Sequence, residues 1–340
     1  MATTPRKNPT GTSIADIARR AGVSSSTVSR ALNNNPAINI TTREKIQAIA
    51  RELNYKVNTG ARNLRLQRSH TIALIINAEK VDGQTFSDPF MMDMIGAIAD
   101  ELNEHQYSLL YSSSAIKPQD WCSHLLSSQR ADGVIVIGQG RNDEPLRKLQ
   151  QESNAVVAWG ARLDNANYCI VGSDNYLGGQ LATRHLIKRG CTRMLFLGDV
   201  EHPEIERRFH GYFDALAEQG LSSREHHVQS AFSIESGYQH VIELLTKGLD
   251  FDGIFAASDN IAMGAINALR EKGLRVPLDV AVVGFDDIPI APYFNPPLTS
   301  VRQNVHLGGK ILVQKVMAMV KGQSVTSEII KTELVVRSSS

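Results

Sequence analysis

The sequence predicts a small all-α head followed by an α/β body made of two doubly wound lobes. Three observations lead to this fold class. The net charge changes sign near residue 70, three short helical patterns precede that point, and apolar strands alternate with amphipathic helices after it. A chain of 340 residues is also long for a single hydrophobic core, so two or three folded units are expected.

The charge divides the chain into two parts. Residues 1–70 carry twelve Lys and Arg against three acidic residues, a net of +9 (12 − 3). The remaining 270 residues carry twenty-four basic and thirty-two acidic residues, a net of −8 (24 − 32). A basic segment joined to a mildly acidic one is typical of a protein in which the basic part binds a polyanion and the acidic part has a different function.

Three helices are expected between Ser13 and Asn54. The first buries apolar residues at helical spacing from Ile14, with Thr12 or Ser13 as its cap, and Gly22 ends it. Ser24 can cap a second helix, 25–32, which the Asn-rich stretch before Pro36 stops. Thr41 and Glu44 have the spacing of a capping box for a third helix.

A helix, a short turn that contains Gly, a second helix and a third packing helix form the helix-turn-helix pattern. In that motif the start of the second helix meets base edges in the major groove. Its outward face here is Ser25, Ser26, Ser29 and Arg30, and Arg30 can fork onto guanine or hold a phosphate. The alternative is a small helical domain with a solvated polar face, which the basic charge disfavours.

The segment 58–66 between head and body is short and basic, with an isolated apolar pair at Leu64 and Leu66. It is too short to be a stable helix alone in water, but such a segment can fold on a partner. An apolar wedge flanked by Arg suits insertion between base steps in the minor groove.

These stretches together resemble the lactose-repressor (LacI/GalR) family. The head residues that carry the resemblance are 12–18, 21–24, 27–30 and 53–55, and residues 61–64 (Ala-Arg-Asn-Leu) are similar to the family's hinge helix. The resemblance implies a DNA-binding domain over 1–57, a hinge and linker over 58–70, and a two-lobed effector-binding and dimerisation domain over 71–340. It also implies that Leu64 opens the central base step. Val57 and Gly60 depart from the family pattern, and Gly60 weakens a hinge helix.

The predicted DNA-binding residues come from the second helix and its flanks, from the start of the first helix, from the end of the third helix and from the hinge. They are Thr12, Ser24, Ser25, Ser26, Thr27, Ser29, Arg30, Asn33, Tyr55, Arg62 and Leu64.

The body alternates β and α patterns in two runs. Apolar strands are expected near 72–76, 107–111, 134–137 and 155–159, and again near 194–197, 254–257 and 280–284, with amphipathic helices between them. Strands that are apolar throughout belong to parallel sheets covered on both faces. The ligand site expected in such folds is a crevice at the carboxyl ends of the strands.

Signatures of catalysis are missing from the sequence. It contains no glycine-rich phosphate loop after the first strand, no G-x-S-x-G elbow and no His/Cys metal spacing. Three scattered Cys, a polar N-terminus and the lack of a long apolar run indicate a reducing compartment without membrane insertion. We therefore expect no catalytic residues, cofactor, metal or membrane partner, and a cytoplasmic, nucleoid-associated protein.

The body also resembles the LacI/GalR family and, through it, the type I periplasmic sugar-binding proteins. Matching stretches are 88–90, 174–179, 208–212, 258–265 and 275–286. The resemblance implies that Arg208 and Asp259 contact an effector, with Asp259 accepting hydroxyl hydrogen bonds. Phe90, Trp159 and Phe232 are candidate platforms for a sugar ring or, equally, core residues. Asp174 is either an effector contact or, slightly favoured, a helix cap.

The predicted function is a sequence-specific transcriptional regulator, most often a repressor, of sugar catabolism or uptake genes. It would bind a pseudo-palindromic double-stranded operator as a homodimer and respond to a sugar or sugar phosphate. The tail lacks heptad leucines, which favours a dimer over a tetramer. Alternatives are a stand-alone soluble sugar-binding module without DNA function, or an enzyme of the doubly wound class.

Overall fold

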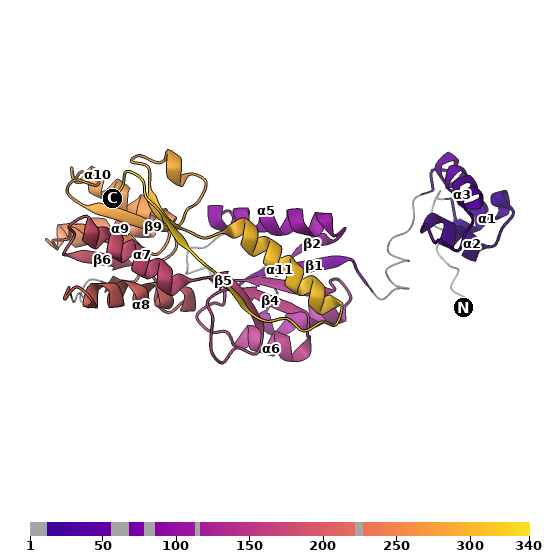
Figure 1. Cartoon of the computed structure of the whole chain (residues 1–340), viewed down its shortest axis with the longest axis horizontal. Coiled ribbons are helices and arrows are strands. Elements are labelled where there is room, and N and C mark those ends of the chain that lie inside the picture. The colour runs from indigo at the N-terminus through magenta and orange to yellow at the C-terminus, as the bar shows by residue number, and fades with distance from the viewer. Residues whose placement is uncertain (1–11, 56–67, 78–85, 113–115, 222–226) are drawn as a thin grey trace, which may run out of the picture. The chain divides into compact units, whose positions relative to one another are not determined.

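The computed structural model describes residues 12–55, 68–77, 86–112, 116–221 and 227–340 (Figure 1). It divides the chain into two compact units, Met1–Gln67 and Arg68–Ser340. The hinge residues Arg62 and Leu64 lie outside the described residues. Among the helices that are described, none has the length and apolar character needed to cross a membrane.

The head consists of three helices, α1 (Ile14–Ala21), α2 (Ser25–Leu32) and α3 (Ile40–Glu52), around a small core. The core residues are Ile17, Ala18, Ala21, Val28, Ala31, Ile46, Ile49 and Ala50. Ser13 caps α1 in a capping box with Asp16, and Gly22 ends it with φ 71°. Thr12 is not the cap, because its hydroxyl donates to the Leu53 carbonyl at 2.9 Å. The three predicted helices are confirmed.

The start of α3 differs from the prediction. Asn39 is the cap, because its Oδ1 accepts the Thr41 N–H at 3.0 Å and the Thr41 hydroxyl at 2.6 Å. The predicted capping box of Thr41 and Glu44 is therefore wrong. The helix begins two residues earlier than a Thr41 cap would give, and Thr41 lies in its first turn as a donor to the cap.

The first lobe of the body is a six-stranded parallel sheet. Its order is β11 (Glu328–Ile330), β5 (Cys169–Ser173), β4 (Val156–Trp159), β3 (Gly133–Ile137), β1 (Thr71–Ile76) and β2 (Ser108–Ser112). Strand residues alternate between two cores. One face packs on α5 (Pro89–Glu104) and α11 (Val305–Val320), which lie side by side (Figure 1), and the other on η3 (Cys122–Ser127) and α6 (Glu144–Glu152), with η2 (Pro118–Asp120) ahead of η3.

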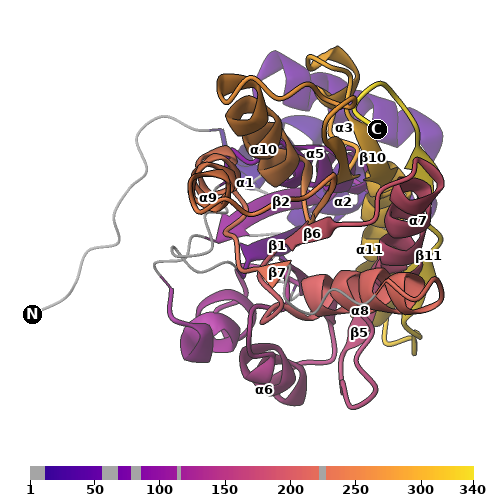
Figure 2. The same ribbon diagram turned by 90° about the vertical axis from the view of Figure 1, so that its left-hand side faces the viewer.

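The second lobe repeats this plan. Its sheet order is β12 (Glu333–Val335), β10 (Thr299–Arg302), β9 (Ala281–Asp286), β8 (Gly253–Ala256), β6 (Met194–Leu197) and β7 (His227–Val228), with only β12 antiparallel among these strands. Helices α7 (Asn175–Lys188) and α8 (Pro203–Ala217) cover one side, and α9 (Ile234–Thr246) and α10 (Asp259–Glu271) the other (Figure 2). The short helix η4 (Ala291–Tyr293) follows β9.

Helices α7 and α8 pack closely through two glycines. A Cβ on Gly179 would lie 2.1 Å from the Arg208 carbonyl oxygen, and one on Gly211 would lie 2.1 Å from the Tyr176 carbonyl oxygen. Because no side chain fits at either position, the two helix backbones approach each other directly. This close approach brings the start of α7 next to Arg208.

The chain crosses between the lobes three times, after β5, after β10 and after β11. The two predicted doubly wound lobes are confirmed, whereas β5, β7, α9, β10, α11, β11 and β12 were not predicted. The carboxyl ends of β1, β3 and β4 in the first lobe and of β6, β8 and β9 in the second face a common space, which holds the cavity described next.

Candidate effector cavity and nucleic-acid interface

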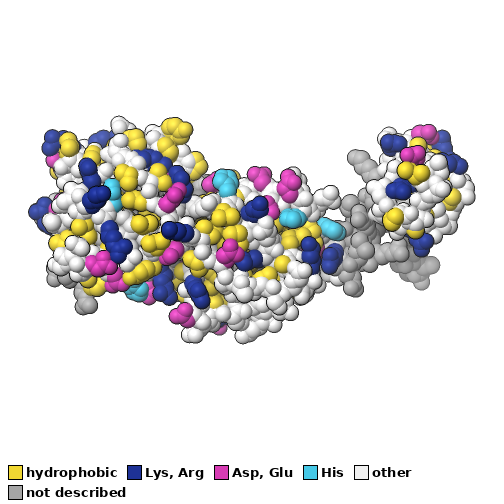
Figure 3. Space-filling model, in the orientation of Figure 1, with side chains coloured by type: hydrophobic (Ala, Val, Ile, Leu, Met, Phe, Trp, Pro, Cys, Tyr) yellow, Lys and Arg dark blue, Asp and Glu magenta, His cyan; other side chains and the backbone are white. Residues whose placement is uncertain are grey.

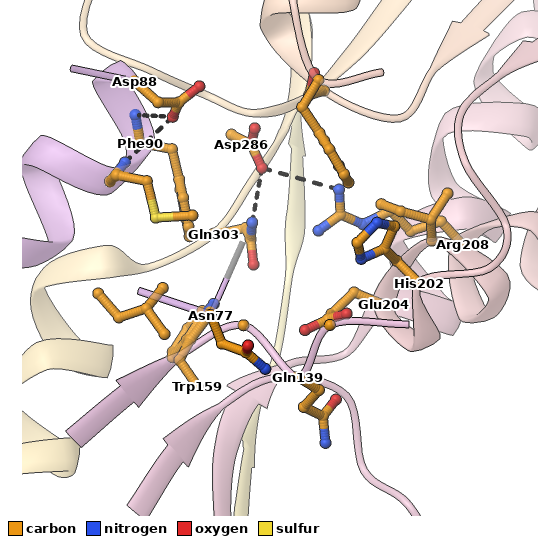
Figure 4. A pocket seen from close by; sticks show the side chains of 17 residues that line it. Asn77, Asp88, Phe90, Gln139, Trp159, His202, Glu204, Arg208, Asp286 and Gln303 are labelled. Atoms are coloured by element: carbon orange, nitrogen blue, oxygen red, sulfur yellow. Dashed lines mark hydrogen bonds and ion pairs between the residues drawn. The ribbon is translucent and has the colours of Figure 1, made fainter. Parts of the chain in front are cut away.

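A narrow cavity of about 60 Å³ lies between the two lobes (Figure 4). Its walls come from segments that follow the carboxyl ends of parallel strands, as the sequence predicted for a ligand crevice. The first lobe supplies Asn77, Asp88, Phe90, Met91, Ile137, Gly138, Gln139, Gly140 and Trp159. The second lobe supplies His202, Glu204, Ile205, Arg208, Phe232, Ser258, Asp286 and Gln303.

The three predicted aromatic platforms all line the cavity and also belong to the core. Phe90, Trp159 and Phe232 are 9%, 4% and 8% exposed. The ring centroids of Phe90 and Trp159 are 6.4 Å apart, and a Cβ on Gly308 of α11 would lie 2.5 Å from the Trp159 ring. The missing side chain at Gly308 therefore makes room for the indole at the cavity wall.

Arg208 lies in the second turn of α8 and is 5% exposed. Its Nε donates to Asn175 Oδ1 at 2.8 Å, and its Nη1 donates to the Ala257 carbonyl. The guanidinium also lies 3.6 Å from the ring centroid of Phe285. Burial lowers the pKa of Arg208 from its usual value, against the opposing effect of Asp286. These partners fix the guanidinium at the cavity wall.

Three carboxyl groups share the cavity with Arg208: Asp88, Glu204 and Asp286. Asp286 ends β9 with φ 114°, and its Oδ1 lies 4.0 Å from Arg208 Nη1 and accepts the Gln303 amide at 2.7 Å. Burial raises the pKa of Asp286 to about 7 although Arg208 opposes the shift. Burial also raises the pKa values of Asp88 and Glu204.

Asp259 and Asp174 do not line this cavity. Asp259 is fully buried, its Oδ1 accepts the Ser300 hydroxyl at 2.6 Å, and its Oδ2 accepts the Ile288 N–H at 2.8 Å. Both oxygens of Asp259 organise the loop after β9, so this carboxyl group does not reach the cavity as expected, whereas that of Asp286 lines it. Asp174 caps α7 by accepting the Leu177 N–H at 3.0 Å, and it faces a separate groove, which confirms the cap that the sequence favoured.

Sequence reasoning missed several residues of the cavity. These are Asn77, Asp88, Gln139, His202, Glu204, Asp286 and Gln303. One signal was available for Asp286, because a carboxylate at the carboxyl end of an apolar strand lies where such folds place their ligand. Asp88 stands just before a predicted helix, where a carboxylate also suits a helix cap. Gln139 is a wall residue rather than a free donor, because its amide already bonds the Ala161 backbone and the Tyr168 hydroxyl.

Two polar contacts join the lobes beside the cavity. Asp88 of the first lobe accepts the Asn260 side-chain amide of the second at 2.7 Å. On another side, Arg141 after β3 pairs with Asp199 after β6 at 2.6 Å and with Glu201 at 3.2 Å. Asp199 is almost fully buried, so this pair is better shielded than a surface ion pair. Both contacts favour the closed arrangement of the lobes.

The head presents a polar face on α2. Ser24, Ser25, Ser26, Arg30 and Asn33 are exposed, while Thr12, Thr27, Ser29 and Tyr55 are half-buried. Ser24 caps α2 by accepting the Thr27 N–H at 3.2 Å, as predicted, and its Oγ also contacts the hydroxyls of Ser26 and Thr27 at 2.8 and 2.9 Å. The start of α2 is therefore a cluster of short hydroxyl side chains followed by one exposed arginine.

The body differs from the head in surface charge. On the face that Figure 3 shows, basic and acidic side chains of the body are interspersed with apolar ones. The head, by contrast, exposes five basic side chains in its described part: Arg19, Arg20, Arg30, Lys45 and Arg51. A surface for a polyanion is thus offered by the head.

Comparisons with known proteins agree with this architecture. A model of bacterial regulatory proteins of the lacI family matches residues 13–58, and a periplasmic binding protein-like domain matches 183–340. The HTH-type transcriptional regulator CelR of Thermobifida fusca is 32% identical over 98% of this chain and 99% of its own. The chain belongs to the lacI family. It is therefore a DNA-binding transcription regulator with a small-molecule effector, not an enzyme.

Further relatives support the assignment to the lacI family. The repressor PurR of Haemophilus influenzae is 31% identical over 96% of this chain and 98% of its own. The lac repressor dimer bound to operator and the anti-inducer ONPF has a TM-score of 0.85 at 25% identity, covering 97% of this chain and 99% of that one. A CelR–cellobiose complex has a TM-score of 0.72 at 29% identity, covering 97% and 100%.

Proposed function

We propose that this lacI-family regulator represses genes of sugar catabolism or uptake by binding a pseudo-palindromic operator as a homodimer. The observation that carries the proposal is the presence, in one chain, of a basic helix-turn-helix head and a closed interlobe cavity. One head contacts little DNA, and two-fold symmetry lets two heads read two half-sites. The solved relatives include a repressor dimer on operator and a complex with cellobiose.

The proposed domain limits and DNA contacts are those that the sequence predicts, and the proposed effector contacts replace Asp174 and Asp259 with Asp286, which lines the cavity. Residues 1–57 bind DNA, and residues 58–70 form the hinge helix and linker between head and body. Residues 71–340 bind the effector and dimerise. The residues proposed to touch DNA are Thr12, Ser24, Ser25, Ser26, Thr27, Ser29, Arg30, Asn33, Tyr55, Arg62 and Leu64. The residues proposed to touch the effector are Phe90, Trp159, Arg208, Phe232 and Asp286.

The cavity gives the effector a way to act on the head. A ligand shifts an equilibrium only through its different affinity for the two states, and a ligand enclosed by both lobes favours the closed state. Arg208 and Asp286 come from the second lobe, whereas Phe90 and Trp159 come from the first. An effector that touches all four therefore changes the balance between closed and open lobes.

The proposed place of action is the cytoplasm, on the nucleoid. The alternative of a stand-alone sugar-binding module accounts for the cavity but not for a basic three-helix unit with an exposed serine-rich reading face. The head therefore favours the regulator.

Replacing Arg30 with alanine is expected to weaken operator binding by about 1–3 kcal/mol, because the side chain is exposed on the reading face of α2. The measurement is affinity for a duplex selected from random sequences by the wild-type protein. If Arg30 reads a base, the preference at one operator position also relaxes in a base-substitution scan.

The matched control is Arg19→Ala. Arg19 is equally exposed in the head but lies on α1, where it pairs with Asp16 at 3.4 Å. We expect a smaller loss that is uniform across base substitutions. Equal losses for the two variants, with an unchanged base preference, would contradict a reading role for Arg30.

A further inference from the structure

The charge balance of the interlobe cavity restricts the chemistry of its ligand. Three carboxyl groups, those of Asp88, Glu204 and Asp286, line it. Arg208 is the only Lys or Arg among the described residues that form its wall. A cavity with this balance presents acceptors for hydroxyl groups but little positive charge for an anion.

The single cation is already committed to the protein. Arg208 donates its Nε to Asn175 and its Nη1 to the Ala257 carbonyl, and Asp286 Oδ1 lies 4.0 Å away. Two of the five guanidinium N–H groups are thus used by the protein, and its charge is shared with Asp286. A bound anionic substituent would therefore face three carboxyl groups against a single cation.

We propose that the cavity selects a sugar that carries no anionic substituent, and that it discriminates against sugar phosphates and uronic acids. The inference rests on the proposed function, since it concerns the effector of the same cavity. Of the two effector classes that the sequence left open, it keeps the sugar and rejects the sugar phosphate.

The aromatic and acidic groups divide the recognition between them. Phe90, Trp159 and Phe232 offer flat apolar surface to the C–H face of a ring. The Asp286 oxygens and the Glu204 carboxyl accept hydroxyl hydrogen bonds from its edge. Because these groups are shielded from water, repulsion of an added negative charge is stronger than it would be at the surface.

The pKa shifts agree with this geometry. Burial raises the pKa values of Asp88 and Glu204, and raises that of Asp286 to about 7. The burial that disfavours the charged form of these carboxyl groups also disfavours the charge of a bound anion. The titratable and charged groups that face Asp286 come from the first lobe and from α8 and α10: Asp88, His202, Glu204, Arg208 and Asp259.

The test compares matched ligands on the full-length protein by isothermal titration calorimetry. The neutral probes are glucose, galactose, mannose and the disaccharides built from them. Each hexose is paired with its hexuronate and its 1-phosphate. We expect at least one neutral sugar to bind, and its anionic partners to bind at least tenfold more weakly. Equal or tighter binding of an anionic partner, or no binding by any neutral probe, would overturn the proposal.

Two variants on α8 test whether the discrimination between sugars comes from the carboxyl groups that line the cavity. Glu204→Gln removes a carboxylate from the cavity, so the ratio between hexose and hexuronate affinities should narrow several-fold. Glu206→Gln, on the exposed side of the same helix, should leave that ratio unchanged. An identical ratio in wild type, Glu204→Gln and Glu206→Gln would contradict the electrostatic origin of the discrimination.

A pH series gives a second readout. A hexuronate keeps its charge between pH 8 and pH 6, whereas Asp286, whose pKa is raised to about 7, loses its charge over that range. The discrimination against the uronate should therefore shrink as the pH falls. Operator binding is measured separately, so a protein that discriminates between sugars but ignores DNA would refute the proposed function and leave this inference standing.

Discussion

Replacing Arg208 with alanine is expected to destabilise the body by about 3–5 kcal/mol and to abolish the response to the effector. The substitution removes a buried cation that bonds Asn175 and the Ala257 carbonyl, and it leaves the Asp286 carboxyl, whose side chain is 11% exposed, without its opposite charge. Truncating one member of a buried charged pair has an effect of this size. Urea unfolding followed by circular dichroism measures the loss, and calorimetry with the best neutral sugar measures the response.

Arg207→Ala is the matched control. Arg207 is the preceding residue of α8, is half-buried, and has no hydrogen bond or ion pair within the described residues. Its substitution should change the free energy of unfolding by less than about 0.5 kcal/mol. Should Arg208→Lys bind the sugar as tightly as wild type, the fixed planar guanidinium is not needed and the assigned role fails.

Operator affinity is expected to fall by about 10³-fold or more between 50 and 200 mM salt. Two heads that together contact six or more phosphates release that many counterions on binding, and affinity then drops steeply with salt. Five exposed basic side chains in each described head make such a number of contacts available. Fluorescence anisotropy of a labelled operator duplex gives the slope.

A matched salt series with neutral sugar in place of DNA is the control. The proposed ligand is uncharged, so sugar affinity should be nearly independent of salt. If operator affinity depended on salt as little as sugar affinity does, the head would not bind DNA through phosphate contacts. A stand-alone sugar-binding module would then be the better account.

Much of the architecture could be predicted from the sequence because local signals and burial agree. The capping serine at Ser24, the turn glycine at Gly22 and the spacing of Ile17, Val28 and Ile46 all indicate the same three-helix head. Apolar strands such as 72–76 and 134–137 indicate buried parallel sheets. The capping box of α3 failed because Asn39 takes the cap position, where its Oδ1 accepts both the N–H and the hydroxyl of Thr41.

Other features depended on contacts that no local pattern contains. Helix α11 is apolar on much of its surface because it packs between α5 and β3, so its sequence lacks a clear polar face. The place of Asp286 at the cavity was missed, because Asp259 and Asp286 both lie at or shortly after the end of a strand. Only the fold shows that Ser300 and Ile288 occupy one carboxylate while the other faces the cavity.

The central claim is that a sugar in the interlobe cavity changes the affinity of the head for DNA. The direct measurement is operator affinity at fixed salt, with and without a saturating amount of the neutral sugar that calorimetry identifies. We predict a change of about fivefold or more, the lower end of ordinary coupling between sites, in the wild-type protein and none in Arg208→Ala. A sugar that binds the wild-type protein tightly and leaves its operator affinity unchanged would contradict the account.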